Sequence, residues 1–205
     1  MRLAPLVAVL VFAAGTLPAN AEPLGEPPEG LAAATFAGGC FWCVEQAFDK
    51  VPGVEQTISG YTGGDTVDPT YHEVSAGGTG HAEAVRVIYD PDRVSYAELL
   101  DHFWHNIDPT VRNRQFCDHG TQYRSAIFYH DEEQRQLAER SREQIEDSGR
   151  LSGPVVTQIV AAGPFYPAED YHQNYYKKNP VRYKFYKRAC GREDRLEELW
   201  GSDAG

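Results

Sequence analysis

Positive charge is scarce in this chain of 205 residues, which has 19 lysine and arginine residues against 30 aspartate and glutamate residues and a net charge of −11. Such a surface repels phosphate groups, which argues against a general nucleic-acid or anionic-membrane binder. Internal repeats and low-complexity tracts are also absent. With 41% hydrophobic residues, 19 glycines and 13 prolines, the chain is not collagen-like, coiled-coil or wholly disordered. We expect one compact domain with a sizeable core.

Long apolar runs are limited to one, at residues 6–14, which follows Arg2 and is too short to cross a bilayer. Ala19-Asn20-Ala21 then gives the small-x-small pattern of a signal-peptidase site. The sequence therefore predicts a signal peptide at residues 1–21, cleaved before Glu22, and export to the periplasm or the exterior without stable membrane association. Such a compartment is oxidising, which affects every cysteine of the mature chain.

The mature chain begins with a Pro-, Gly- and Glu-rich stretch that predicts a flexible lead-in at residues 22–31, before a single domain at residues 32–205. Ser95 with Glu98 forms a capping box that starts one helix. Periodicity and turn residues predict strands at 32–37, 54–58, 82–89, 125–129 and 155–161, and helices at 41–49, 96–105, 131–147 and 197–200. This irregular mixture indicates an α+β fold, a two-layer α/β sandwich with a ferredoxin-like mixed sheet, long coil segments and a wrapping C-terminal arm.

Cysteines number only four, and the first stands directly after Gly38-Gly39. Two glycines let the chain turn sharply from a strand into a helix, which presents Cys40 at the helix start. Unpaired backbone N–H groups and the helix dipole favour a thiolate there. Cys40 and Cys43 form a C-x-x-C pair, a spacing typical of redox-active cysteines in exported proteins.

Other interpretations of the cysteines remain open at this point. Cys117 and Cys190 could complete a zinc site, although the paired C-x-x-C spacing is missing, or they could form a passive disulfide. A papain-like hydrolase would use Cys40 with His172. That pattern places Trp directly after the nucleophile, whereas here Phe41 lies between Cys40 and Trp42. A non-catalytic secreted domain with disulfides and a general thiol–disulfide oxidoreductase are the alternative functions.

An ordered set of motifs decides among these alternatives. They are Gly39-Cys40-Phe41-Trp42, Gly60-Tyr61-Thr62-Gly63-Gly64, Pro69-Thr70-Tyr71, Gly80-His81-Ala82-Glu83-Ala84-Val85, Tyr89-Asp90-Pro91, Phe103-Trp104, Asp108-Pro109-Thr110, Asp118 with Gly120, Gln122-Tyr123-Arg124-Ser125 and Tyr171-His172-Gln173. Together they resemble the A-type peptide methionine sulfoxide reductases, over most of the mature chain. The resemblance implies an enzyme that reduces methionine S-sulfoxide, free or in proteins, and so repairs oxidative damage.

The resemblance also implies roles for single residues. Cys40 matches the nucleophile, whose thiolate attacks the sulfoxide sulfur. Glu83 matches the acid that protonates the sulfoxide oxygen, assisted by the hydroxyls of Tyr71 and Tyr123, and Asp118 matches a further polar residue of the site. We expect partial burial to raise the pKa of Glu83, because the acid must keep its proton near neutral pH.

The substrate's methyl group would contact an apolar wall formed by Phe41 and Trp42. Attack leaves a sulfenic acid on Cys40, and a second cysteine condenses with it to a disulfide that a thioredoxin-like dithiol reduces. Cys190 and Cys43 are both candidates for this resolving residue, with Cys190 preferred. The chain departs from the common family pattern here, since Cys43 replaces a glycine. The resemblance implies no metal, flavin or nucleotide cofactor, and we expect a monomer.

Overall fold

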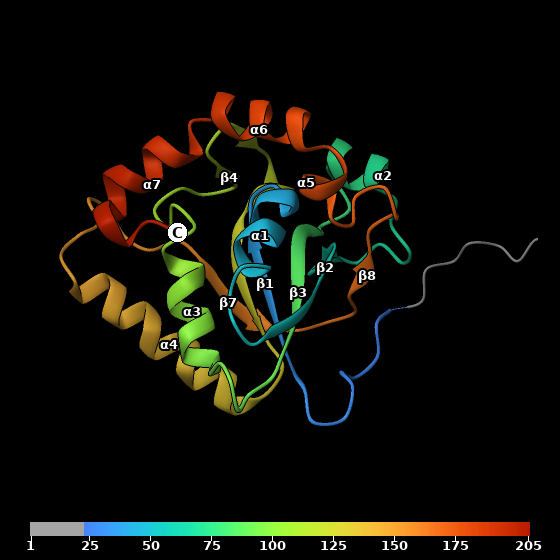
Figure 1. Ribbon diagram of the computed structural model, residues 1–205, viewed down its shortest axis with the longest axis horizontal. Helices are drawn as coiled ribbons and strands as arrows, with labels where there is room; N and C mark the ends of the chain where they lie inside the picture. The colour runs from blue at the N-terminus through green and yellow to red at the C-terminus, as the bar shows by residue number, and fades with distance from the viewer. Residues whose placement is uncertain (1–22) are drawn as a thin grey trace, which may run out of the picture.

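The structure is a computed structural model, in which residues 23–205 are described (Figure 1). Its main sheet has six strands in the order β7-β6-β1-β3-β2-β8, and a separate hairpin pairs β4 with β5. The strands are β1 (Ala32–Gly38), β2 (Val54–Thr62), β3 (Ala82–Tyr89), β4 (Arg114–Gln115), β5 (Asp118–His119), β6 (Ser125–Tyr129), β7 (Gln158–Ala161) and β8 (Tyr166–Pro167). The helices are α1 (Phe41–Phe48), α2 (Tyr71–Ala76), α3 (Tyr96–Trp104), α4 (Glu132–Asp147), α5 (Tyr175–Lys178), α6 (Pro180–Ala189) and α7 (Arg192–Trp200), with short 3-10 turns η1 (Thr121–Tyr123) and η2 (Gly201–Asp203).

The centre of the sheet has the predicted ferredoxin-like arrangement. The chain runs β1-α1-β2-β3-α3-β6, and β1 lies between β3 and β6 with antiparallel pairing on both sides. The helix α4 then connects β6 to β7, which extends the sheet in parallel to β6. The sheet is therefore mixed, as the sequence predicted, and α1 and α3 cover the face that Figure 1 turns to the viewer.

Local sequence explains where the helices begin. The Ser95 side chain accepts a hydrogen bond from the Glu98 N–H, and Glu98 accepts one from the Ser95 N–H, so the predicted capping box is confirmed. The same pattern at Thr70 and Glu73 starts α2, which our sequence analysis missed. That short helix carries Tyr71 at its first position.

The core between sheet and helices is built on aromatic rings. Phe36 of β1 stacks on Phe48 of α1 at 4.9 Å and on Phe103 of α3 at 5.0 Å between centroids. Each of these side chains is almost fully buried, and burial of one such ring stabilises the fold by about 1.5–3 kcal/mol. This packing fixes the position of α1 relative to β1, and the turn between them contains Cys40.

The C-terminal arm wraps over α1, as predicted, although it contains two helices that the sequence analysis missed. The red and orange helices α5, α6 and α7 run along the top of the molecule in Figure 1. Tyr183 of α6 donates a hydrogen bond to Gln46 of α1 at 2.7 Å. Arg192 of α7 is buried and donates to the Gly38 carbonyl, at the end of β1. The arm is thus anchored on both sides of the Cys40 turn.

The start of the described chain is less free than a flexible lead-in would be. The Leu24 N–H donates to the Phe165 carbonyl at 2.9 Å, and Arg86 donates to the Leu24 carbonyl. The predicted signal peptide lies outside the described residues. Within residues 23–205, every helix is too short or too polar to cross a bilayer.

Candidate active site

Cys40 occupies the turn that joins β1 to α1. Gly39 has a φ of +84°, and a Cβ added there would lie 2.5 Å from the Cβ of Gln115. Glycine is therefore required for both conformation and space. Cys40 is the N-cap residue of α1, and only 6% of its surface is exposed.

One cavity of about 70 Å³ opens beside Cys40. It is lined by Cys40, Phe41, Trp42, Tyr71, Glu83, Asp118, Tyr123 and Tyr186. The structure thus brings together all seven residues that the sequence analysis assigned to catalysis or substrate binding, from five separate segments of the chain. Tyr186 is the eighth, and the sequence analysis did not find it. The cavity is large enough for a small group, such as the end of one side chain.

Glu83 is the buried acid of this cavity. Its side chain points from β3, is 2% exposed, and accepts a hydrogen bond from the Phe41 N–H at 3.0 Å. Burial raises the pKa of Glu83 from 4.5 to about 8, even though this hydrogen bond acts in the opposite direction. Glu83 is therefore mostly protonated near neutral pH, in the direction that we expected.

The pKa of the Cys40 thiol shifts in the direction opposite to the one that we predicted. Burial is the main cause that raises the pKa of Cys40 above its ordinary value, followed by a hydrogen bond to Cys43. The Cys40 side chain makes no capping hydrogen bond, and the Phe41 N–H at the start of α1 donates to Glu83. The prediction that the helix start favours a thiolate on Cys40 is thus wrong.

The pKa of Cys43 shifts in the opposite direction. The hydrogen bond from Cys40 is the main cause that lowers the pKa of Cys43 from 9.0 to about 6, with smaller contributions from Arg192, Tyr183 and Lys187. These three groups come from the C-terminal arm, which therefore stabilises a thiolate one helical turn from Cys40.

Aromatic side chains fix the apolar wall of the cavity. The Trp42 ring stacks on Tyr175 at 3.8 Å between centroids, and its Nε1–H donates to His172 Nδ1 at 3.0 Å. Burial lowers the pKa of His172 to about 4, so its ring is neutral and Nδ1 can accept. The indole of Trp42 is held on its face and at its nitrogen, and therefore has a fixed orientation.

Hydroxyl groups line the polar side. Burial raises the pKa of Tyr71 to about 12 and raises that of Tyr123 as well, so both hydroxyls keep their protons and can donate hydrogen bonds. Tyr186 donates to Asp118 Oδ2 at 2.6 Å. This bond links α6 to the β4–β5 hairpin across the cavity.

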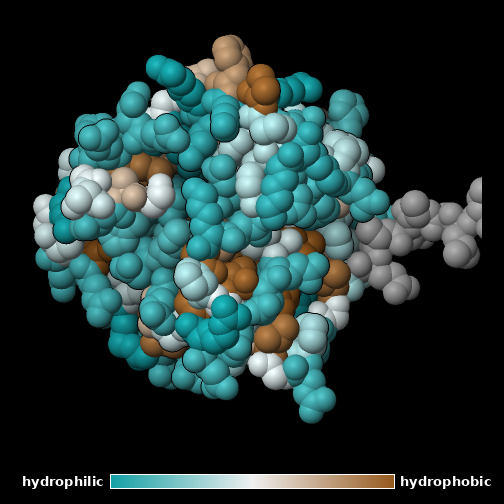
Figure 2. Space-filling model, viewed as in Figure 1, coloured by the Kyte–Doolittle hydropathy of each residue, from teal (hydrophilic) through white to brown (hydrophobic). Residues whose placement is uncertain are grey.

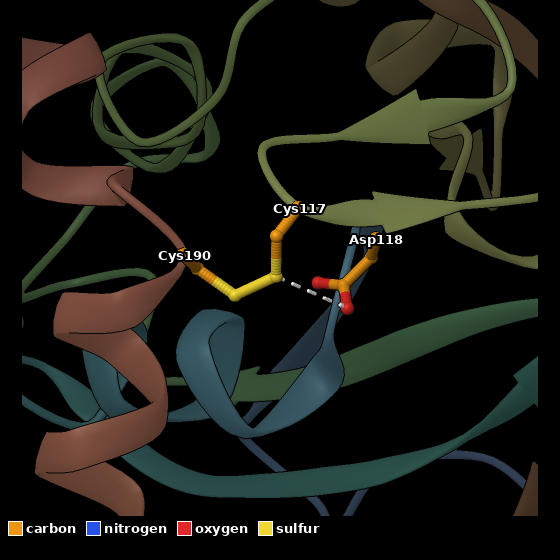
Figure 3. Close-up of side chains that lie close together, drawn as sticks. All are labelled: Cys117, Asp118 and Cys190. Carbon is orange, nitrogen blue, oxygen red and sulfur yellow. Dashed lines mark hydrogen bonds between the residues drawn. A yellow bond between two sulfur atoms is a disulfide. The ribbon is translucent and has the colours of Figure 1, made fainter.

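Cys117 and Cys190 form a disulfide (Figure 3). The bond joins the β4–β5 hairpin to the residue that follows α6, with a sequence separation of 73. Cys190 is therefore bonded, while Cys40 and Cys43 are both free, and the preference for Cys190 as the resolving residue stays a prediction. The sequence left open a bond between Cys117 and Cys190, and the structure contains it.

Asp118 stands next to this disulfide, and Cys117 Sγ lies 3.7 Å from its Oδ1 (Figure 3). A disulfide sulfur has no proton, so this contact becomes a hydrogen bond only after reduction. The three ligand-type atoms of Cys117, Asp118 and Cys190 lie within 4.8 Å of one another. Because the two sulfurs are bonded to each other, they are not the thiolates that zinc would require.

Comparisons with known proteins agree on one family. The family described as "Peptide methionine sulfoxide reductase" matches residues 32–204. Peptide methionine sulfoxide reductase MsrA of Bacillus licheniformis is 53% identical over 168 residues, which cover 82% of this chain and 93% of that protein. The solved methionine sulfoxide reductase A of Corynebacterium diphtheriae has a TM-score of 0.70 at 34% identity, covering 86% of this chain and 92% of that one. The reduced form of Mxr1 from Saccharomyces cerevisiae has a TM-score of 0.71 at 32% identity, covering 76% and 90%. The chain therefore belongs to the A-type peptide methionine sulfoxide reductases.

Proposed function

We propose that the chain reduces methionine sulfoxide to methionine, with Cys40 as the nucleophile and Glu83 as the proton donor. The observation that carries the assignment is their common cavity, in which a thiol and a protonated carboxyl face the same small space. Attack on a sulfoxide sulfur needs both groups, because oxygen leaves sulfur only after it is protonated.

The proton positions suit the first step. As Cys40 attacks, its proton passes to the neighbouring Cys43, whose lowered pKa lets it stand as a thiolate. A bond forms between Cys40 Sγ and the sulfoxide sulfur, and Glu83 transfers its proton to the oxygen. The oxygen then moves to Cys40 as a sulfenic acid, and the reduced thioether leaves. The sulfoxide gains two electrons, and Cys40 loses two.

The lining residues contact the bound sulfoxide group from two sides, one apolar and one polar. Phe41 and Trp42 contact the methyl group, while Tyr71 and Tyr123 donate hydrogen bonds to the oxygen together with Glu83. Asp118 keeps Tyr186 in place at the cavity. A volume of about 70 Å³ admits the end of a methionine sulfoxide side chain and leaves the rest of the substrate outside. Free, peptide and protein substrates therefore share the same bound group.

Cys43 is the resolving residue of this proposal. It received the Cys40 proton in the first step, and it gives up that proton to the leaving sulfenic oxygen as its sulfur attacks Cys40. A disulfide forms between the two, and water leaves with the sulfenic oxygen. Cys43 is favoured over Cys190 because it already contacts Cys40, while Cys190 is bonded to Cys117. Cys40 and Cys43 are three positions apart, so a disulfide between them requires only that the first turn of α1 deforms.

A thioredoxin-like dithiol then returns the enzyme to its reduced form by thiol–disulfide exchange. The alternative of a general thiol–disulfide oxidoreductase needs accessible thiols, whereas Cys40 and Cys43 are 6% and 5% exposed. This burial favours a dedicated reductase for a small oxidised group.

The leader pattern supports export, because the family match begins at residue 32 and leaves the predicted signal peptide outside it. We expect protein purified from the native host to begin at Glu22. Amino-terminal sequencing tests this expectation, and an intact Met1 would contradict it.

A single-turnover experiment tests the activity. The reduced protein is mixed with a peptide that contains methionine sulfoxide, without any further reductant. The masses of the protein and the peptide are then measured by mass spectrometry. We expect the peptide to lose its oxygen in the wild type and to keep it in the Cys40→Ser variant. A peptide that the wild type leaves oxidised would refute the proposed function.

A further inference from the structure

The helix α6 has two different faces. Its inner face carries Tyr183 and Tyr186, which cover Cys43 and the catalytic cavity. Its outer face carries Val181 and Phe185, one helical turn apart, which are 83% and 78% exposed. Figure 2 shows apolar atoms that protrude at the top of the molecule, where Figure 1 places α6. Two large apolar side chains at this spacing, unused by the core, are typical of a helix that contacts another protein.

Positive charge surrounds these two side chains. Arg182, Lys184 and Arg188 are exposed on α6, which has no acidic residue, and none of the three forms an ion pair within the described chain. The whole chain has a net charge of −11. The basic and apolar face of α6 therefore attracts an acidic partner, while the net negative charge of the chain repels a second copy of this protein.

The same helix leads directly to an accessible disulfide. Cys190 follows α6 and is bonded to Cys117, which is exposed, while Cys190 is partly exposed. Cys40 and Cys43 lie beneath the arm and are buried. A protein that contacts the outer face of α6 therefore reaches Cys117–Cys190 before it reaches the catalytic pair.

We propose that the outer face of α6, defined by Val181, Phe185, Arg182, Lys184 and Arg188, is the docking surface for an acidic protein dithiol that reduces Cys117–Cys190. The inference rests on the proposed function, which requires a dithiol reductant. Apolar contacts with Val181 and Phe185 hold the partner, and its acidic groups pair with the three free cations. The accessible disulfide at the end of the helix then lies beside the partner's cysteines.

The electrons balance in two exchanges. A partner thiolate attacks one sulfur of Cys117–Cys190, and the partner's second thiol completes the exchange, so the partner is oxidised and Cys117 and Cys190 become thiols. These thiols lie beside Asp118, which lines the catalytic cavity. They reduce the Cys40–Cys43 disulfide in the same way, which restores the Cys40 and Cys43 thiols and re-forms Cys117–Cys190. Two electrons and two protons pass through each exchange.

The test compares two reductants on a surface variant. The Val181→Ser/Phe185→Ser double variant is assayed on free methionine sulfoxide, with purified thioredoxin and its NADPH-dependent reductase or with dithiothreitol. The matched control is Val67→Ser/Val160→Ser, which alters two other exposed valines. We expect kcat/KM for thioredoxin to fall at least about tenfold in the α6 variant only, the size of effect that interface anchors have. Turnover with dithiothreitol should stay within about twofold of the wild type.

A charge variant sharpens the test. Lys184→Glu with Arg188→Glu should lower kcat/KM for thioredoxin and weaken its dependence on salt, while Arg140→Glu on α4 should change neither. Cys117→Ser/Cys190→Ser should lower the ratio of the thioredoxin-supported rate to the dithiothreitol-supported rate. An unchanged ratio would mean that electrons do not pass through this disulfide, which would overturn the proposal.

Further outcomes separate the docking surface from other roles. Thioredoxin-supported turnover equal to that of the control variant would overturn the proposal, and single-turnover reduction of the sulfoxide would still support the proposed function. An α6 variant that loses activity only on oxidised protein substrates would assign the surface to substrate binding. Loss of binding to anionic phospholipid vesicles, with thioredoxin kinetics unchanged, would assign it to a membrane. Both results would overturn the docking of a dithiol.

Discussion

Two pairs of cysteines in one molecule have opposite surroundings. Cys40 and Cys43 are buried free thiols beside a protonated carboxyl, and Cys117 and Cys190 are bonded to each other near the surface. The first pair lies within one turn of α1, while the second joins segments 73 residues apart. The second ties the arm to the β4–β5 hairpin, together with the hydrogen bond from Tyr186 to Asp118.

The comparison shows that environment, and not the cysteine itself, determines the chemistry. The C-terminal arm contributes to both pairs, since Arg192, Tyr183 and Lys187 lower the pKa of Cys43 and Cys190 closes the disulfide. A single structural element therefore tunes the buried thiols and carries the accessible bond. Each prediction below changes one side of this comparison.

The largest effect is expected at the carboxyl of the buried pair. Glu83→Gln keeps an oxygen for the Phe41 N–H but removes the proton donor, so the rate of the first turnover should fall about 10²–10⁴-fold. In the wild type this rate should decline as the pH rises through about 8, because the acid form of Glu83 disappears. Stopped-flow measurement of Cys40 oxidation across pH checks both expectations. A variant with wild-type rates would remove Glu83 from the mechanism.

The Glu83 carboxyl should also make the free energy of unfolding depend on pH. The pKa of Glu83 is raised from 4.5 to about 8 in the folded state, so its stabilising contribution is complete below the unfolded value and is lost as the pH rises towards 8. Denaturant unfolding at several pH values should show this loss in the wild type and not in Glu83→Gln. Parallel curves for the two proteins would contradict it.

The next effect concerns the second thiol of the buried pair. Cys43→Ser should still reduce about one equivalent of sulfoxide, but later turnovers with millimolar dithiothreitol should slow at least about 10²-fold, because an external thiol must replace a neighbouring one. Product formed per enzyme in a burst experiment measures this difference. Normal cycling of Cys43→Ser would transfer the resolving role to another cysteine.

The smallest effect is expected at the accessible pair and concerns stability. Cys117→Ser/Cys190→Ser should lower the free energy of unfolding by about 2–4 kcal/mol, because the disulfide restricts the unfolded chain over 73 residues. Urea denaturation of the variant and of the oxidised and reduced wild type measures it. An oxidised wild type as labile as the variant would show that the bond does not stabilise the arm.

Sequence patterns were sufficient for much of the fold. The Ser95 and Glu98 capping box started α3 as predicted, and the apolar run in β3 was placed at its observed bounds. α6 was missed because its most exposed residues include Val181 and Phe185, which removes the usual apolar periodicity. Tertiary contacts of Tyr183 and Tyr186 stabilise that helix, and the local sequence does not contain this information.

The candidate site was likewise predictable from the sequence only in part. The motifs identified residues that do converge on one cavity, because each motif fixes a local segment and the sheet brings the segments together. The direction of the pKa shift of Cys40 could not be predicted, since it depends on burial and on the Cys43 side chain beside it. The Cys117–Cys190 pairing likewise depends on where α6 ends relative to the hairpin.

The most direct test of the account is the partner of Cys40 after one turnover. The enzyme with free Cys40 and Cys43 and an intact Cys117–Cys190 disulfide is treated with one equivalent of methionine sulfoxide, its remaining thiols are blocked in acid, and its disulfides are mapped by mass spectrometry. The account predicts a new Cys40–Cys43 bond. A bond from Cys40 to Cys190 or Cys117 instead would contradict it.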